Sequence, residues 1–304
     1  MKKLLTCFAF ICVFCISASA KQIAPDYEVD GVGYMLTFEG TLAVTSRSVV
    51  NVDYISTLEA PIASAFVYRT GSVAYEGVVE VPAEVYIEEL DKTLPVTTVE
   101  IGAFINCPEL EEVILPSSVT YIAMYAFADN PKLKSVNLAS TIALSHGIFR
   151  GCSSLKSVEI PETVIAIHVA PFYNSGIESI SLPESVISME GQAFTGANSL
   201  KSIICPVPTP SDITVYANVI EGCYIEVPEG CVLYVPEESV EAYKAAALWS
   251  NFADILPIGS AAIEETEAVT DDADAPAYNL LGQPVANPRP GDFIIRNGKK
   301  QLFQ

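Results

Sequence analysis

The sequence is poor in the residue types that most catalytic and nucleic-acid-binding sites need. It has two histidines and one tryptophan, and 16 basic residues stand against 37 acidic ones. The formal net charge of −21 argues against nucleic acid and anionic membrane surfaces as partners, because both require a basic surface. Two histidines leave little material for imidazole catalysis or zinc binding. Half of the residues are apolar, which is ample for a buried core.

Motifs that carry enzymatic chemistry are also missing. The chain has no G-x-S-x-G, H-E-x-x-H, P-loop or G-x-G-x-x-G motif, and it has no C-x-x-C pair after residue 20. Carboxylates are abundant, but no spacing selects two of them as the acid and base of a glycosidase. We therefore predict no catalytic residue, no metal site and no cofactor, and we infer that the protein is not an enzyme.

The longest apolar run lies at the N-terminus and is too short for a membrane-spanning helix. A basic start precedes the apolar residues 4–16, and Ala-Ser-Ala follows at 18–20. This is the pattern of a secretory signal peptide over residues 1–20, whereas a bilayer requires about 20 apolar residues. Lipidation at Cys12 or Cys15 is an alternative, although bulky residues precede both. We predict an exported mature chain without a transmembrane segment.

The body of the chain repeats every 22 or 23 residues. Phenylalanine recurs at 104, 127, 149, 172 and 194. Each unit opens with L-x-x-V-x-L/I, whose first, fourth and sixth residues we expect to point inward from a short strand. The period lies within the range of about 20–29 residues that leucine-rich repeats have, and such units bury their apolar faces only by stacking. The sequence predicts a mainly β fold, a short leucine-rich-repeat solenoid of about 5–6 rungs.

The segments around the repeats predict terminal caps and a small tail. The linker carries six acidic residues and no basic ones, whereas the tail has a local charge of +3 and two or three short apolar runs between Gly and Pro turns. Within the C-terminal cap we expect closing strands over 224–228 and 232–236 and a helix over 237–249. The predicted order is signal peptide 1–20, β-rich N-terminal cap 21–93, solenoid 94–204, C-terminal cap 205–258, acidic linker 259–276 and β-rich tail 277–304.

The repeat motif L-x-x-V-x-L-P-x-x-V-x-x-I-x-x-x-A-F-x-x-C/N resembles that of the BspA-like leucine-rich repeat family of bacterial surface proteins. The segment from Leu233 to Phe252 is similar to a closing segment often found in that family, and the resemblance covers about residues 75–258. It implies a secreted or surface-displayed protein that binds other proteins; fibronectin and fibrinogen are ligands associated with the family's namesake. The tail from Tyr278 to Lys300 is similar to C-terminal modules of proteins exported by the type IX route.

The outward side of the repeat strand is the candidate binding face. Three of the few lysines share the second position of the repeat, and serines recur at the third. Such a face can hydrogen-bond an acidic partner or a glycan. The alternative is a solvated strand surface that repeat duplication has merely copied. The predicted partner-binding residues are Lys134, Lys156, Lys201, Ser135, Ser157, Ser179, Ser202, Asn137 and Glu159.

The cysteines after the signal peptide receive a structural interpretation. Cys107 and Cys152 share a repeat position that elsewhere holds small residues, which favours packing. They lie two units apart, beyond the reach of a disulfide. Cys223 and Cys231 could instead pair across the closing strands in an oxidising compartment.

The two histidines, His146 and His168, lie at nearby positions of adjacent repeats. No carboxylate is placed beside them by the pattern. We interpret them as separate polar surface residues, with a weak metal-binding or pH-sensing role as the alternative.

These observations predict an exported, non-enzymatic, adhesin-like protein that displays its repeat face at the bacterial surface. The expected partner is a protein, with a host extracellular-matrix protein as one candidate. The alternative function is a glycan-binding or nutrient-capture accessory protein of the cell envelope. Sites of that kind use exposed aromatic rings, and the candidates are Tyr216, Tyr224 and Tyr234.

Overall fold

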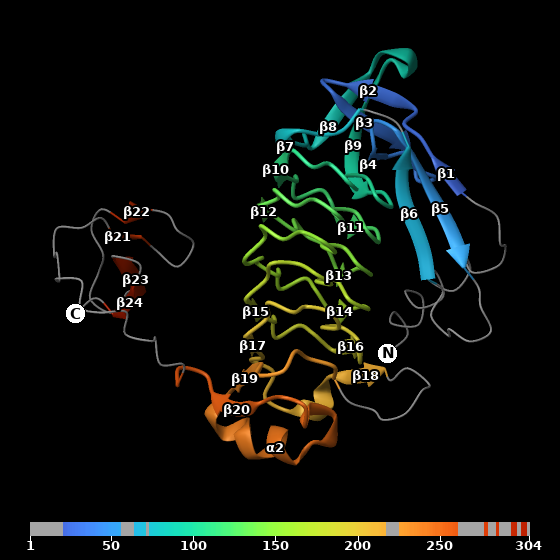
Figure 1. Cartoon of the computed structure of the whole chain (residues 1–304). Helices are drawn as coiled ribbons and strands as arrows, with labels where there is room; N and C mark the ends of the chain where they lie inside the picture. Colours follow the sequence, from blue (N-terminus) through green and yellow to red (C-terminus); the bar gives the residue numbers. More distant parts are fainter. Residues whose placement is uncertain are drawn as a thin grey trace. The chain divides into compact units, whose positions relative to one another are not determined.

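The computed structural model describes most of the chain after residue 20 (Figure 1). The predicted signal peptide with its cysteines, Cys223, Tyr224 and nearly all of the acidic linker lie outside the described residues. The chain divides into two compact units, residues 1–261 and residues 262–304. The described residues are 21–55, 64–70, 73–216, 225–260, 277–278, 284–285, 293–296 and 299–302.

The fold is mainly β, and the repeats contribute short strands to two series of parallel pairings. In the first series the opening strands of successive repeats pair, so that Glu112 lies beside Ser135 and Ser179 beside Ser202. In parallel pairing, equivalent residues of successive repeats lie next to one another. The apolar positions that recur in the sequence therefore form one continuous buried core.

The opening strands form two sheets along one side of the repeats (Figure 1). One consists of β7 (Gly77–Glu80), β10 (Leu110–Ile114) and β12 (Ser135–Val136), in the order β12-β10-β7. Residues 155–161 run between the two sheets without strand pairing. The other sheet has the order β15-β17-β19-β20, with β15 at Ser179–Ser181, β17 at Ser202–Ile204, β19 at Val232–Val235 and β20 at Asp254–Pro257.

The second strands of the repeats form the other series of sheets. One runs β11-β9-β4-β3-β2, and β8 pairs antiparallel with β9; the other runs β13-β14-β16-β18. The first of these sheets extends the repeats toward the N-terminus by two antiparallel connections. The bounds are β2 Tyr27–Val29, β3 Val32–Leu36, β4 Leu42–Thr45, β8 Glu84–Ile87, β9 Lys92–Val99, β11 Tyr121–Ile122, β13 Ala143–Leu144, β14 Ala166–Ile167, β16 Ser188–Glu190 and β18 Thr214–Tyr216.

The phenylalanine that marks each repeat stacks on its counterparts in the neighbouring repeats. The ring centroids of Phe104, Phe127, Phe149 and Phe172 are 5.4, 5.6 and 6.0 Å apart in successive pairs, with interplanar angles of 16°, 13° and 11°. These rings are fully buried, and Phe194 is buried in the next repeat. Such aromatic pairs contribute about 0.5–1.5 kcal/mol beyond their buried area. The stack therefore ties each repeat to the next.

In the turn after each phenylalanine, the second residue after the phenylalanine has a left-handed backbone conformation. Asparagine, aspartate and glycine adopt this region most readily, and these three types occupy the position. The residue that follows is buried in each repeat, which limits its size. The left-handed residues, with their φ angles, are Asn106 (52°), Asp129 (58°), Gly151 (73°), Asn174 (52°) and Gly196 (67°).

A second antiparallel sheet lies near the N-terminus, in the order β1-β5-β6. Its strands are β1 (Lys21–Ile23), β5 (Val49–Ile55) and β6 (Ser64–Thr70), and a 3₁₀ turn, η1, spans Glu88–Leu90. Ile23 and Val50 belong to a small separate core that also contains residues of the first repeats. This core fixes the sheet to the repeats. The repeat residues are Ile105, Tyr125 and Ala128.

The expected helix over 237–249 is broken into three pieces. They are the 3₁₀ turn η3 (Glu237–Ser239), the helix α2 (Val240–Ala245) and the 3₁₀ turn η4 (Ala247–Trp249). Ala246 is extended, with φ −85° and ψ 110°. Beyond this break Trp249 is buried, with its ring 4.9 Å edge-on from Tyr243. Packing of the tryptophan thus outweighs helical continuity.

The remaining expected elements are found only in part. The predicted strand over 232–236 is present as β19. Residues 225–228 of the other predicted strand, 224–228, do not form a β-strand. The 3₁₀ turn η2 spans Pro210–Asp212. In the second unit the tail forms four short antiparallel strands, not two or three, in the order β22-β21-β23-β24. Their bounds are β21 Ala277–Tyr278, β22 Pro284–Val285, β23 Phe293–Arg296 and β24 Lys299–Leu302.

Candidate functional site

The predicted lysines lie in one row on the exposed side of the opening strands. Lys134 directly precedes β12, Lys201 directly precedes β17, and Lys156 occupies the same position of the repeat between them. Their side chains are 65%, 75% and 62% exposed. Lys134 and Lys201 directly precede strands whose inward residues are buried, so the backbone fixes these two positions while all three ammonium groups stay in water.

The same row also carries glutamates, which form ion pairs with the lysines, so the positive charge of the row is largely neutralised. Nζ of Lys134 lies 2.7 Å from a carboxylate oxygen of Glu111. Glu178 lies between the other two lysines, 2.9 Å from Nζ of Lys201 and 3.2 Å from Nζ of Lys156. Three lysines and two glutamates leave a net charge of +1. Hydrogen bonds from Lys201 and then Lys156 lower the pKa of Glu178, and Lys134 lowers that of Glu111 in the same way.

The four serines of the face offer hydroxyls that the described structure leaves free. Ser135, Ser157 and Ser179 are exposed, and Ser202 is partly buried beside Ser179 in the parallel register. Among the described residues, none of the four hydroxyls has a hydrogen-bond partner. Each can both donate and accept a hydrogen bond. We call the three lysines and the four serines the serine–lysine row.

Asn137 and Glu159, which were predicted with the row, differ in role. The Asn137 side chain accepts a hydrogen bond from Leu115 N at 2.6 Å and donates one to Leu115 O at 2.8 Å. Both ends of this amide therefore join neighbouring repeats, which makes Asn137 a structural residue. Glu159 is exposed and adds a carboxylate next to the row.

Both histidines are partly buried, and each contacts a side chain of a neighbouring repeat. Nδ1 of His168 lies 2.9 Å from Oε1 of Glu190, which occupies the same position one repeat later. His146 packs edge-on against the ring of Tyr125, with 5.2 Å between the centroids. Burial lowers the pKa of His146, and this effect exceeds the opposing influence of Glu190. In the part of the chain that the structure describes, no group of three or more His, Cys, Asp or Glu side chains could hold a metal ion.

The four described cysteines are buried and not in disulfides. Burial raises the pKa of the Cys152 and Cys231 thiols to about 12 and raises that of Cys205 as well. Sγ of Cys152 donates to Phe127 O at 3.0 Å. These thiols are poor nucleophiles because a buried thiol resists ionisation. Packing thus accounts for Cys152, as expected from its repeat position.

No helix within the described residues is long and apolar enough to cross a membrane.

The chain is similar to a known repeat family and to several solved structures. The model of the BspA type leucine-rich repeat region matches the chain in six copies, over residues 84–201 and 139–227. A leucine-rich cell surface protein from Faecalibacterium prausnitzii A2-165 is 26% identical over 61% of this chain and 40% of that protein, with a TM-score of 0.44. This chain therefore spans less than half of that protein. No curated protein matches the chain.

Two further solved structures are similar at lower identity. A leucine-rich repeat protein from T. pallidum is 21% identical over 68% of this chain and 86% of its own, with a TM-score of 0.43. One from Bacteroides capillosus ATCC 29799 is 22% identical over 63% and 97%, with a TM-score of 0.33. The matched residues contain the strands from β8 to β18 and the phenylalanine stack. Residues 84–227 are thus a BspA-type leucine-rich repeat region, which confirms the resemblance indicated by the repeat motif.

Proposed function

We propose that this chain is an exported, non-enzymatic protein-binding protein that presents the serine–lysine row to a partner at the bacterial surface, in the manner of an adhesin. The observation that carries the proposal is the row itself. It gathers four unpartnered hydroxyls and three exposed ammonium groups at the second and third positions of successive repeats, where Ser135 and the pair Ser179 and Ser202 lie on parallel paired strands. The proposal includes the six segments predicted from the sequence, with the repeats forming a short solenoid that is closed by a cap at each end.

The geometry of the row suits an extended segment or flat surface of a protein. Neighbouring strands lie about 4.8 Å apart, so the three steps from Lys134 to Lys201 span roughly 15 Å. The ion pairs with Glu111 and Glu178 are exposed and contribute little to stability. A partner's carboxylates can therefore replace those glutamates at small cost, while partner amides bond the serine hydroxyls.

Binding of the purified chain to immobilised fibronectin, fibrinogen and collagen tests the proposal. The test variant replaces Lys134, Lys156 and Lys201 by glutamate. The control variant replaces Lys92, Arg150 and Lys244, which are exposed and lie off the row, by glutamate. Both variants change the net charge equally, from −21 to −27.

We expect the row variant to weaken the binding of at least one matrix protein about tenfold or more, and the control variant to change it less than about twofold. Binding should also weaken at higher salt, because exposed charges are screened. Equal losses in the two variants would mean that bulk charge governs binding and not the row. Unchanged binding in a folded row variant, or no binding to the panel, would contradict the proposal.

Glycan binding is the second candidate function, and one aromatic residue supports it. Tyr216 ends β18 with 48% of its surface exposed, which suits stacking against a sugar ring. Tyr234 is only partly exposed within β19. A glycan array that gives saturable signals abolished by Tyr216→Ala, together with silence on the matrix panel, would favour this function.

A further inference from the structure

The first series of strands begins at an open edge. β7 is the outermost strand of its sheet, with β10 on one side only. Gly77 N donates to Glu109 O at 2.8 Å and Val81 N to Ile114 O at 2.9 Å, so alternate residues of β7 face β10. The intervening backbone groups, those of Val78 and Glu80, must point to the other edge. Among the described residues, those groups have no hydrogen-bond partner.

The other series of strands continues further toward the N-terminus. There β9 pairs with β4, which continues into the antiparallel strands β3 and β2, and β2 is the outermost strand. At the far end of the first series, β20 ends in Pro257, which lacks an N–H. Proline in an edge strand hinders pairing with another chain. The sequence of β7 contains no proline.

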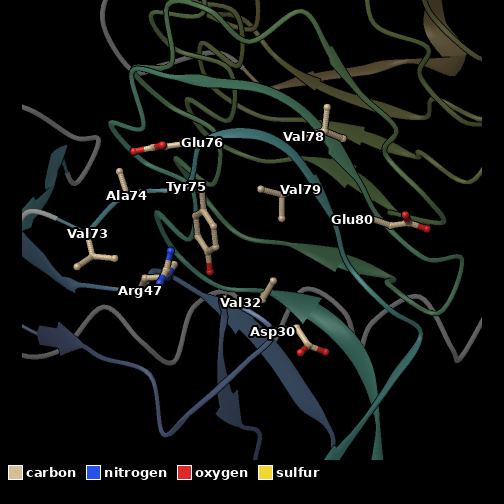
Figure 2. Close-up of a pocket in the computed structure, with 11 residues that line it drawn as sticks. Asp30, Val32, Arg47, Val73, Ala74, Tyr75, Glu76, Val78, Val79 and Glu80 are labelled. Carbon is tan, nitrogen blue, oxygen red and sulfur yellow. The ribbon is translucent and has the colours of Figure 1, made fainter.

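A cavity of about 550 Å³ lies against the open edge. Figure 2 shows the Tyr75 ring directed toward Arg47 and Val32, while the carboxylates of Glu76 and Glu80 point away from one another. The Tyr75 hydroxyl donates to Thr45 O at 2.6 Å and accepts from Gly33 N at 3.0 Å. These buried hydrogen bonds join Tyr75 in the wall of the cavity to the antiparallel strands β3 and β4, so the cavity is preformed.

The lining combines apolar contact positions with excess negative charge. Val78 and Val73 are 61% and 43% exposed, whereas Val32 and Val79 are buried. Asp30, Glu76 and Glu80 line the cavity with one basic residue, Arg47. That guanidinium is already engaged by Glu28 at 2.9 Å, outside the lining set. The cavity therefore favours a cation.

We propose that the open edge of β7 binds an extended basic peptide segment of a partner protein by strand addition. Main-chain groups of the segment pair with Val78 and Glu80, as in other complexes in which a peptide adds to a sheet edge. Apolar side chains of the segment contact Val78, and the basic side chains that alternate with them pair with the carboxylates of Glu76 and Glu80. A second copy of this chain is disfavoured, because its net charge of −21 would meet an acidic site and only its tail carries a positive local charge. This site is separate from the serine–lysine row and does not depend on it.

Fluorescence anisotropy with a labelled seven-residue peptide that alternates valine and lysine tests the site on the full chain. Two comparison peptides carry glutamate in place of lysine, or N-methyl groups on alternate main-chain nitrogens that prevent strand addition. Val78→Pro removes one outward N–H, and proline is tolerated where an edge N–H faces solvent. Val78→Thr keeps this N–H and the branched shape, and it serves as the matched control.

We expect saturable binding of the lysine peptide, weakened about tenfold by Val78→Pro but less than about threefold by Val78→Thr. The N-methylated and glutamate peptides should bind at least about tenfold more weakly. Glu76→Lys combined with Glu80→Lys should reverse the preference between lysine and glutamate peptides, which gives a second readout if Val78→Pro does not fold. Equal binding of the N-methylated peptide, or no binding of the lysine peptide, would overturn the proposal. Neither result bears on the serine–lysine row, whose test uses different residues.

Discussion

Asn130 provides the sharpest test of how the repeats hold together. Its side chain is fully buried and makes three hydrogen bonds, two of which reach the preceding repeat. Nδ2 donates to Phe104 O and to Phe127 O, both at 2.8 Å, while Oδ1 accepts from Cys107 N at 2.7 Å. We expect Asn130→Ala to lower the free energy of unfolding by about 3 kcal/mol, because a buried polar group that loses its partner costs about 1–3 kcal/mol.

This magnitude follows from counting which groups lose a partner. The Phe127 carbonyl still accepts a hydrogen bond from the Cys152 thiol at 3.0 Å, so it is not left without a partner. The Phe104 carbonyl and the Cys107 N–H lose the partners that Asn130 supplied. Two such losses at about 1.5 kcal/mol each give the expected value.

Ser175→Ala is the matched control, since Ser175 is the buried residue at the same repeat position. Its hydroxyl accepts one long hydrogen bond, from Ile177 N at 3.4 Å, so we expect a loss below about 1 kcal/mol. Urea unfolding followed by circular dichroism and by the fluorescence of Trp249 measures both variants, and the two signals must coincide for a two-state analysis. Losses that agree within about 0.5 kcal/mol would refute the assignment of stability to the Asn130 hydrogen bonds.

Three further expectations concern backbone conformation, protonation and thiol reactivity. A Cβ at Gly196 would lie 2.2 Å from the Tyr173 ring on a backbone with φ +67°, so Gly196→Ala should destabilise by about 2–3 kcal/mol; Gly230→Ala, at φ +82° in open space, should cost about 1 kcal/mol. Burial lowers the pKa of His146 below 6.5, so as the pH falls the unfolded chain binds a proton at this residue before the folded chain does. Acid therefore destabilises the parent through this residue, and we expect His146→Gln to lose less stability than the parent between pH 7.5 and 5. Because burial raises the pKa of the Cys152 thiol to about 12, iodoacetamide at pH 8 should alkylate it only after denaturation, as read by mass spectrometry.

Each of these expectations has a clear contrary result. Equal melting temperatures for the two glycine variants would show that the clash with Tyr173 relaxes without cost. A pH profile of the histidine variant that runs parallel to the parent's would show that His146 has the same pKa in both states. Rapid alkylation of Cys152 in the native protein would mean that the repeat around it opens easily.

Much of the repeat architecture follows from the sequence, because the same residue types return at the same spacing. The phenylalanine steps located the buried stack, and the recurrence of asparagine, aspartate and glycine two residues later reflects the left-handed turn. The pairing of Glu178 with lysines was also visible in principle, since Glu178 holds the repeat position of Lys156 and Lys201. The same holds for His168 and Glu190, which share a position four residues before a phenylalanine.

Non-repeated segments were harder to predict. The pattern of residues 237–249 fits a helix, yet the chain is extended at Ala246 so that Trp249 can pack beside Tyr243. Helical propensity is weak compared with the burial of an aromatic side chain. Asn137 was expected in the binding face, but its amide bonds the backbone of Leu115. No local pattern distinguishes these two uses of an exposed asparagine.

The sequence by itself determined the period, the inward residues and the family of the repeat, because these depend on local spacing that every unit shares. Only the tertiary structure decided which charges meet, where the strand series ends and which backbone groups remain unpaired. The open edge of β7 illustrates the difference. Its residues look like any other strand in the sequence, and its edge is open because the N-terminal strands extend the other series of sheets instead.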